Sequence, residues 1–141
     1  MKNLRRLVVS LAVLLVALCL PAPVSAAEIT HSGTCGKNLT WTLDDEGTLT
    51  ISGEGKMSNY ENNTPPWREL DVRKVVVESG VTSIGDYAFE ADKNYLNNLT
   101  QISLPSTLKT IGYRSFAGSR IEHIKIPNSV VEIYDNAFEY S

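Results

Sequence analysis

Hydrophobic residues recur in the same order three times between residue 72 and the last residue of the sequence. Each copy runs 18 residues from an aliphatic residue to a phenylalanine, with further apolar residues at offsets 3, 5, 9 and 12. A repeat of this length is typical of solenoids, in which successive copies stack as coils because none can bury its apolar face alone. We therefore predict a repeat solenoid. Its coils are residues 72–98 (coil 1), 99–120 (coil 2) and 121–141 (coil 3).

The offsets also predict the course of each coil. Offsets 3 and 5 lie on the same side of a short strand, because side chains alternate along a strand, and Pro105 and Pro127 end it in coils 2 and 3. The strands of successive coils should pair in parallel, and offsets 9 and 12 should return along the other side. Gly85 and Gly112 allow a sharp bend there, followed by one helical turn that brings each phenylalanine inward to stack. Tyr134 replaces this glycine in coil 3, so its bend is the least supported.

Five extra residues separate coil 1 from coil 2. They fall within residues 91–98, after the phenylalanine of coil 1. We expect them to bulge on the convex side of the solenoid, where chain length is tolerated.

The segment before the repeats predicts a cap for coil 1. Leu39 to Ser52 reads as a β-hairpin, because apolar residues and threonines alternate on both sides of an Asp-Asp-Glu-Gly turn. Residues 28–36 predict an irregular lead-in. Because an uncovered first coil would expose its apolar face, residues 27–71 should form an N-terminal β-hairpin cap and loop. Met57, Tyr60 and Trp67 should belong to this cap.

The first 26 residues predict a secretory signal peptide. A basic start precedes an uncharged apolar run from Leu7 to Leu20, and small residues before residue 27 suit cleavage. Fourteen apolar residues are too few for the ~20 of a membrane-spanning helix. We therefore expect a secreted or cell-surface protein without membrane insertion after cleavage. Removing Lys2, Arg5 and Arg6 lowers the formal net charge from −3 to −6, which argues against nucleic-acid partners.

The sequence predicts no catalytic residue, no metal site and no cofactor. His31 and His123 are not spaced as zinc ligands, and no nucleophile or phosphate-binding motif occurs. Cys35 is the one cysteine left after cleavage, so the fold cannot depend on an internal disulfide. We expect Cys35 to be a small buried hydrophobic residue.

The repeats resemble a known family. The stretch Leu99-Thr-Gln-Ile-Ser-Leu-Pro105 is similar to the strand part of the BspA-type (treponemal) leucine-rich repeat, and Ile84-Gly-Asp-Tyr-Ala-Phe89 is similar to its bend. Residues 32–53 resemble a module that often precedes such repeats. The cysteine that usually follows the phenylalanine in this family is missing from all three coils. The resemblance implies a leucine-rich repeat fold with short parallel strands and a helical or irregular convex side. It also implies a bacterial surface or secreted protein that binds other proteins and acts in adhesion.

The strand face opposite the core is the candidate binding surface. Offsets 2, 4 and 6 point outward there and form a mixed, mildly basic ladder on an acidic protein. Its residues are Lys74, Val76 and Glu78 in coil 1, Gln101, Ser103 and Pro105 in coil 2, and His123, Lys125 and Pro127 in coil 3. Such a ladder suits a protein or glycan partner, and the alternative is an ordinary solvated face.

Three functions follow from the sequence. The first is an exported, non-catalytic repeat protein that binds a macromolecule through its strand face. The second is a terminal piece of a longer surface protein without activity of its own, and the third is a secreted hydrolase. In addition, coil 3 has no polar cap after Phe138, so self-association through this coil is expected.

Overall fold

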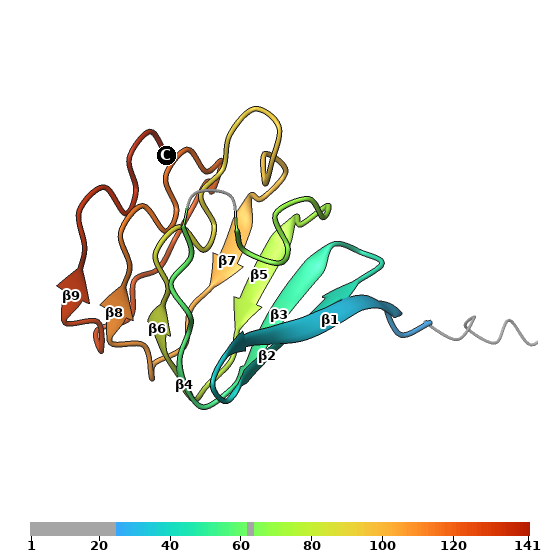
Figure 1. The fold of residues 1–141 in the computed structure, drawn as a ribbon, viewed down its shortest axis with the longest axis horizontal. Helices are drawn as coiled ribbons and strands as arrows, with labels where there is room; N and C mark the ends of the chain where they lie inside the picture. Colours follow the sequence, from blue (N-terminus) through green and yellow to red (C-terminus); the bar gives the residue numbers. More distant parts are fainter. Residues whose placement is uncertain (1–24, 62–63) are drawn as a thin grey trace, which may run out of the picture.

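A computed structural model describes residues 25–61 and 64–141 as a β-solenoid of three coils with an N-terminal cap (Figure 1). The predicted repeat solenoid is therefore confirmed. The predicted signal peptide, residues 1–26, lies outside the described residues except for Ser25 and Ala26. In the described part of the chain, no helix has the length and apolar character needed to cross a membrane.

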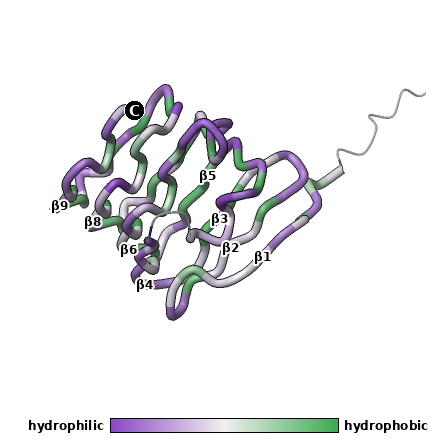
Figure 2. The backbone as a smooth tube through the Cα atoms, turned by 45° about the horizontal axis from the view of Figure 1, so that its top comes forward, coloured by the Kyte–Doolittle hydropathy of each residue, from purple (hydrophilic) through white to green (hydrophobic). Residues whose placement is uncertain are grey.

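Two sheets form the sides of the solenoid. The strands are β1 (Ile29–Gly36), β2 (Leu39–Asp44), β3 (Thr48–Gly53), β4 (Gly55–Lys56), β5 (Lys74–Val77), β6 (Val81–Ile84), β7 (Gln101–Ser103), β8 (Thr110–Ile111) and β9 (Glu132–Ile133). One sheet has the order β1-β2-β3-β5-β7 and the other has the order β4-β6-β8-β9. Figure 1 shows the coils side by side, with β1 at one end and β9 at the other. Figure 2 shows hydrophobic and hydrophilic stretches alternating along the coils, as the chain passes between core and surface.

The cap continues the first sheet of the solenoid. Strands β2 and β3 form the predicted hairpin, paired antiparallel from Leu39↔Gly53 to Leu43↔Leu49. Its turn contains Gly47 at φ 83°, a left-handed conformation that suits glycine. Strand β3 then pairs in parallel with β5, and β5 pairs in parallel with β7. The first strand of coil 1, β5, is thus paired along both of its edges.

The prediction for residues 28–36 is wrong. This segment is a strand, β1, paired antiparallel with β2, so the cap has three strands rather than two. It lacks an alternating apolar pattern because it lies at the edge of the sheet and is mostly exposed. Gly33 is needed opposite Trp41, since a Cβ atom there would lie 2.8 Å from the indole nitrogen. Cys35 is buried, 2% exposed, as expected.

A stack of aromatic rings runs through the core. The rings of Phe89 and Phe116 stack with centroids 5.5 Å apart, and those of Phe116 and Phe138 with centroids 5.3 Å apart. The predicted phenylalanine stack is therefore present. Trp67 of the cap extends the stack, with its ring centroid 5.5 Å from that of Phe89. The indole nitrogen of Trp67 donates a 2.8 Å hydrogen bond to the carbonyl oxygen of Ala88. Trp67 is completely buried and covers coil 1 in the way a further phenylalanine would.

The bends of the coils differ from the expectation. No helix is assigned within residues 25–61 and 64–141, and each phenylalanine is delivered by a turn. The left-handed residue of this turn stands at offset 15 in every coil: Tyr87, Arg114 and Asn136, with φ between 50° and 58°. Gly85 and Gly112 are not left-handed, so the reason we gave for these glycines is wrong. They are required because adjacent backbones touch: a Cβ atom on Gly85 would overlap the carbonyl oxygen of Ser58.

Coil 3 is less regular than coils 1 and 2. Strand β9 pairs with β8, and the Tyr134 N–H still donates to the Ile111 carbonyl at 2.9 Å, so the bend forms despite the missing glycine. On the other side, however, coil 3 contacts β7 through one isolated bridge, Gln101↔His123. The parallel strand that we predicted for Ile124 to Ile126 is not assigned.

Candidate binding surface

The structure brings the predicted ladder residues together in rows across the first sheet. Lys74 of β5 pairs with Gln101 of β7, and Gln101 forms the bridge with His123 of coil 3. Val76 pairs with Ser103 in the next row. Neighbouring strands lie about 4.8 Å apart, so each row presents side chains at a fixed short spacing.

All seven residues of this binding prediction are accessible. Val76 is half-buried, and the exposed members are Lys74, Glu78, Gln101, Ser103, His123 and Lys125. Glu78 lies just after β5, where its N–H donates to the carbonyl oxygen of Ile51 at 2.9 Å. Pro105 and Pro127 are half-buried beyond the strand ends. The ladder is thus accessible to a partner along its length.

The part of this surface that lies on the cap was not predicted from the sequence. Thr48 pairs with Lys74, and Thr50 pairs with Val76, so both rows continue into β3. The row through Thr50 then crosses β2 at Thr42 and β1 at Ser32. A further row on the cap joins Ser52, Thr40 and Thr34, and all these hydroxyl side chains are exposed or half-buried. The alternation of threonine with leucine and tryptophan in the hairpin carried this signal. Only the parallel pairing of β3 with β5 shows that these hydroxyls extend the ladder.

The structure also opens a cleft beside the ladder. It has a volume of about 460 Å³ and lies between coil 2 and coil 3. Its lining comprises Ile102, Ser103, Leu104 and Ser106 of coil 2 and Lys125, Ile126, Pro127, Asn128 and Ser129 of coil 3. The sequence pattern had assigned the aliphatic members to the core. They are only half-buried because coil 3 does not pair with β7 beyond His123.

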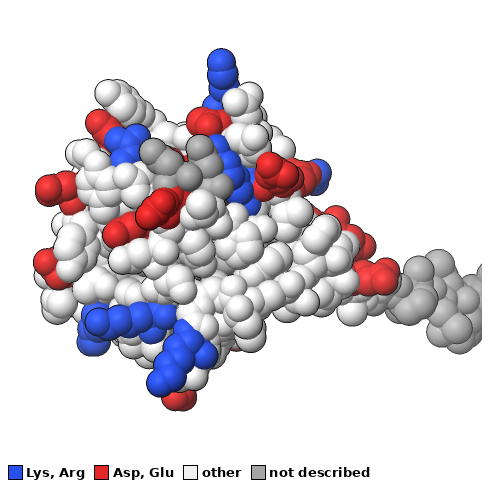
Figure 3. All heavy atoms as spheres, viewed as in Figure 1, with Lys and Arg blue, Asp and Glu red and all other residues white. Residues whose placement is uncertain are grey.

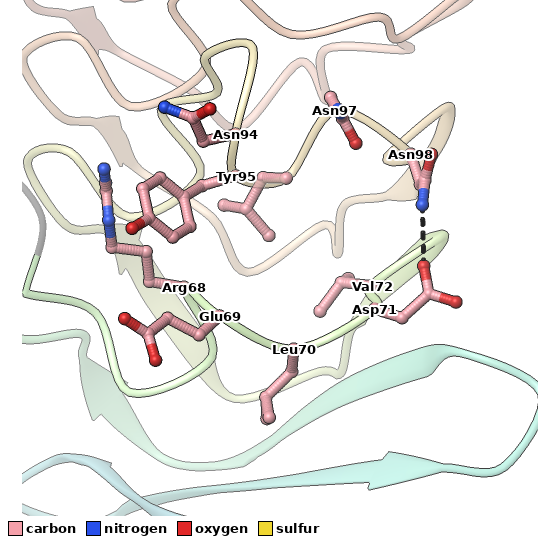
Figure 4. A pocket seen from close by; sticks show the side chains of 10 residues that line it. Arg68, Glu69, Leu70, Asp71, Val72, Asn94, Tyr95, Asn97 and Asn98 are labelled. Atoms are coloured by element: carbon pink, nitrogen blue, oxygen red, sulfur yellow. Dashed lines mark hydrogen bonds between the residues drawn. The ribbon is translucent and has the colours of Figure 1, made fainter.

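A second cavity, of about 330 Å³, lies away from the strand face, between the loop before coil 1 and residues 94–98 (Figure 4). Its polar groups bind one another. The guanidinium of Arg68 lies 3.8 Å from the ring centroid of Tyr95, and the Asn98 side-chain amide donates to Asp71 at 2.8 Å. Hydrogen bonds from Arg73 and Asn98 lower the pKa of Asp71. These contacts fasten the extra residues at the end of coil 1 to the cap loop, and the cavity is a weak binding candidate.

Charged groups elsewhere serve the stacking of coils. Arg114 of coil 2 donates to Glu90 of coil 1 at 2.8 Å and also pairs with Glu139 of coil 3. The carboxylate of Glu90 raises the pKa of Arg114, which is charged at any ordinary pH in either case. In the view of Figure 3, acidic and basic side chains are interspersed over the upper part of the molecule, and further basic side chains lie at its lower left.

Among the described residues, potential metal ligands are not clustered and the cysteine is buried. Within residues 25–61 and 64–141, no cluster of three or more His, Cys, Asp or Glu side chains is placed to hold a metal ion. Burial raises the pKa of the Cys35 thiol to about 11, so very little reactive thiolate exists at neutral pH. What the surface does provide is hydrogen bonding, positive charge and an apolar cleft.

Comparison with known proteins agrees with the repeat pattern. The family model described as "BspA type Leucine rich repeat region (6 copies)" matches residues 67–141. A leucine-rich repeat protein from Eubacterium ventriosum ATCC 27560 is similar in structure, with a TM-score of 0.61 and 26% identity over 79% of this chain. This chain spans 36% of the length of that protein. Among curated proteins, none matches this chain.

Two further solved structures are more distant. A leucine-rich cell surface protein from Faecalibacterium prausnitzii A2-165 gives a TM-score of 0.42 and 15% identity, covering 82% of this chain and 53% of that protein. A leucine-rich repeat protein of T. pallidum gives a TM-score of 0.40 and 21% identity, covering 75% of this chain and 66% of that protein. The family model covers more than half of the sequence and begins at Trp67, the residue that starts the aromatic stack. The chain therefore belongs to the BspA-type leucine-rich repeat family, as its repeats predicted.

Proposed function

We propose that this protein is an exported, non-catalytic leucine-rich repeat protein of the bacterial surface that binds a protein or glycan through its strand face. The observation that carries the proposal is the continuous row Thr48–Lys74–Gln101–His123, which crosses from the cap into coil 3. The proposed role in adhesion rests on membership of the family together with this row.

The construction of the first sheet supports a binding role. One side of β5 faces the core, where Val75 and Val77 are at most 3% exposed, and the other side presents Lys74, which is exposed, and Val76, which is half-buried. Because the backbone of the sheet is already ordered, only the side chains lose conformational entropy when a partner binds. Hydroxyls, an amide and lysines can hydrogen-bond both to a protein backbone and to sugar hydroxyls.

Support for export comes from the sequence. The basic start and the apolar run within residues 1–26 have the form of a signal peptide. Mass spectrometry of the protein recovered from culture medium or from the cell surface should find an N-terminus near residue 27. Recovery of the full-length chain from the cytoplasm would contradict export.

The binding role can be tested with matched charge changes. The mature chain, residues 27–141, would be screened against glycan and surface-protein arrays. The same screen would then use the triple variant Lys74→Glu, Gln101→Glu and Lys125→Glu. We expect the triple variant to lose every specific signal. The control variant, Lys56→Glu with Lys109→Glu, changes two exposed lysines outside the ladder, and it should retain the binding signals of the unmodified chain. Unchanged binding by the triple variant would refute the strand face as the binding surface.

The alternative of a secreted hydrolase is tested separately. The mature chain should show no turnover in a broad screen of glycoside, ester and peptide substrates. Turnover that survives repurification and disappears on replacement of one residue would establish the hydrolase instead.

A further inference from the structure

The cleft between coils 2 and 3 has features that the rest of the strand face lacks. Its volume of about 460 Å³ is within the range of small-ligand sites. Its aliphatic lining residues, Ile102, Leu104 and Ile126, are all half-buried. The equivalent residues of coil 1, Val75 and Val77, are fully enclosed. A hydrophobic group placed in the cleft would therefore bury the aliphatic side chains that coils 2 and 3 leave partly exposed.

Equivalent hydroxyl groups show how the cleft arises. The side chain of Thr107 in coil 2 binds the backbone of coil 1. Its Oγ1 accepts a 3.0 Å hydrogen bond from the Gly80 N–H and donates one of 2.8 Å to the Val81 carbonyl. Ser129 stands at the same offset in coil 3. Its Oγ is buried and has no hydrogen-bond partner among the described residues. The two hydrogen bonds by which the hydroxyl of Thr107 joins coil 2 to coil 1 therefore have no counterpart from Ser129 between coil 3 and coil 2.

The unpaired hydroxyl points to a ligand. A buried hydroxyl without a partner costs free energy, so such groups are normally satisfied. Ser129 lines the cleft, but its Oγ is closed to solvent, so the side chain must rotate about χ1 before a ligand atom can supply the missing hydrogen bond. Apolar walls, a buried hydroxyl and one charge are the usual composition of a ligand site.

The charge on the cleft selects the ligand further. Among the described residues that line it, Lys125 alone is charged, and its side chain is exposed. A carboxylate would pair with this ammonium group. Against Ile102, Leu104 and Ile126 an aliphatic side chain is a better occupant than a sugar, whose hydroxyls would lose water there without gaining hydrogen bonds. The polar lining residues, Ser103, Ser106 and Asn128, could bond either a peptide or a sugar.

We propose that this cleft binds an extended acidic peptide segment, which places one aliphatic side chain between Ile102 and Ile126. A neighbouring carboxylate pairs with Lys125, and a backbone carbonyl accepts a hydrogen bond from Ser129. The proposal rests on the proposed binding function and names the chemistry of the partner.

The test uses the uniformly ¹⁵N-labelled mature chain and the peptide acetyl-Asp-Val-Asp-Leu-Asp-amide. Titration followed by NMR should shift first the amides of residues 102–104, 106, 125–126 and 128–129, since Pro105 and Pro127 have no N–H. Two control peptides separate the components of recognition: one has lysine in place of aspartate, and the other has glycine in place of valine and leucine. We expect both controls to bind at least about tenfold more weakly, since each lacks one of the two contacts.

Three variants locate the site. Ser106→Trp fills the mouth of the cleft from an exposed position and should abolish binding. Lys125→Glu should weaken binding about tenfold and Ser129→Ala about fivefold, from the lost ion pair and hydrogen bond. Lys109→Glu, an exposed lysine outside the cleft, should leave the affinity unchanged. Because Lys125 and Ser106 are not core residues, these variants should fold, and circular dichroism checks this.

Several results would overturn the proposal. They are equal binding of all three peptides, no binding by any of them, and peptide shifts that appear only along Lys74 and Gln101. Shifts of the cleft amides on dilution without peptide would assign the cleft to a second copy of the chain, and shifts produced by maltopentaose would assign it to a glycan.

The outcome is independent of the test of the proposed function. That test can be repeated with Lys74→Glu and Gln101→Glu alone, which lie outside the cleft. Loss of macromolecular binding in that double variant without peptide binding in the cleft would leave the strand face as the site and remove the cleft. Peptide binding by the cleft together with an unaffected double variant would remove the ladder instead.

Discussion

Coils 1 and 3 carry the same hydrophobic offsets but are buried to different degrees. In coil 1, Ile84 is 2% exposed and Phe89 is completely buried. The equivalent residues of coil 3 are Ile133, which is 48% exposed, and Phe138, which is half-buried. The strand residues follow the same trend, since those of coil 1 are enclosed and those of coil 3 are half-buried.

The difference comes from the neighbours of each coil. Coil 1 lies between the cap, which stacks Trp67 on its phenylalanine, and coil 2. Coil 3, among the described residues, packs against coil 2 on one side. The strand pairing differs in the same way. Strand β5 is paired along both of its edges, whereas coil 3 pairs with β7 through one isolated bridge. A repeat sequence therefore specifies which residues can be buried, and its neighbours determine which of them are.

The largest effect should separate two phenylalanines of the stack. Phe116 stacks between two rings and is completely buried, so Phe116→Ala should destabilise the fold by about 3–5 kcal/mol. Phe138 stacks on one ring only and is half-buried, so Phe138→Ala should cost about half as much. Urea unfolding of the mature chain measures both, with Tyr140→Ala as the control because that side chain is 86% exposed. Equal losses would show that coil 3 is as well covered in solution as coil 2.

A smaller effect should come from the ion pairs that tie coil 3 to the others. Arg114 joins Glu90 and Glu139, and all three side chains are 17–29% exposed. We expect Arg114→Met to cost about 2 kcal/mol, between the values typical of surface pairs and of buried pairs. Arg120→Met, at an exposed arginine, should cost almost nothing. The difference between the two should shrink in 1 M NaCl, and a difference independent of salt would mean that packing of the Arg114 stem matters more than its charge.

The smallest effect concerns self-association. We propose that coil 3 of one molecule docks on coil 3 of another, because Val131, Ile133 and Tyr134 present apolar surface that is 80%, 48% and 47% exposed. Sedimentation of the mature chain should show a concentration-dependent dimer, and Ile133→Glu should weaken it about tenfold. Thr34→Glu, on the cap, should have no effect. A monomer at all concentrations would end this proposal and leave the exposure of coil 3 as a property of the free protein.

Much of the fold was predictable because the repeats state it three times. The spacing of aliphatic residues and phenylalanines predicted stacked coils, parallel strands and the aromatic stack. The first strand was missed, since an exposed edge strand needs no alternating pattern. The roles of Gly85 and Gly112 were also misread, because contact between backbones of adjacent coils leaves the same glycine signal as a left-handed bend.

The candidate site was predictable only in part. The outward residues of the ladder follow from strand alternation, and the structure confirms that they are accessible. The cleft was not predictable, because Ile102, Leu104 and Ile126 fit the core pattern as well as their counterparts in coil 1. Whether Ser129 forms the hydrogen bonds to the preceding coil that Thr107 forms depends on how closely two coils approach. No residue pattern encodes that distance.

By itself the sequence determined the repeat, the family and the side of each strand that faces the core, since these depend on the order of side chains along the chain. The tertiary structure decided how far each coil is covered, how the rows continue into the cap and where a cleft opens. These depend on the separation of segments far apart in the sequence. Burial and hydrogen bonding fall off over a few ångströms, so a small displacement of coil 3 turns core residues into the walls of a binding site.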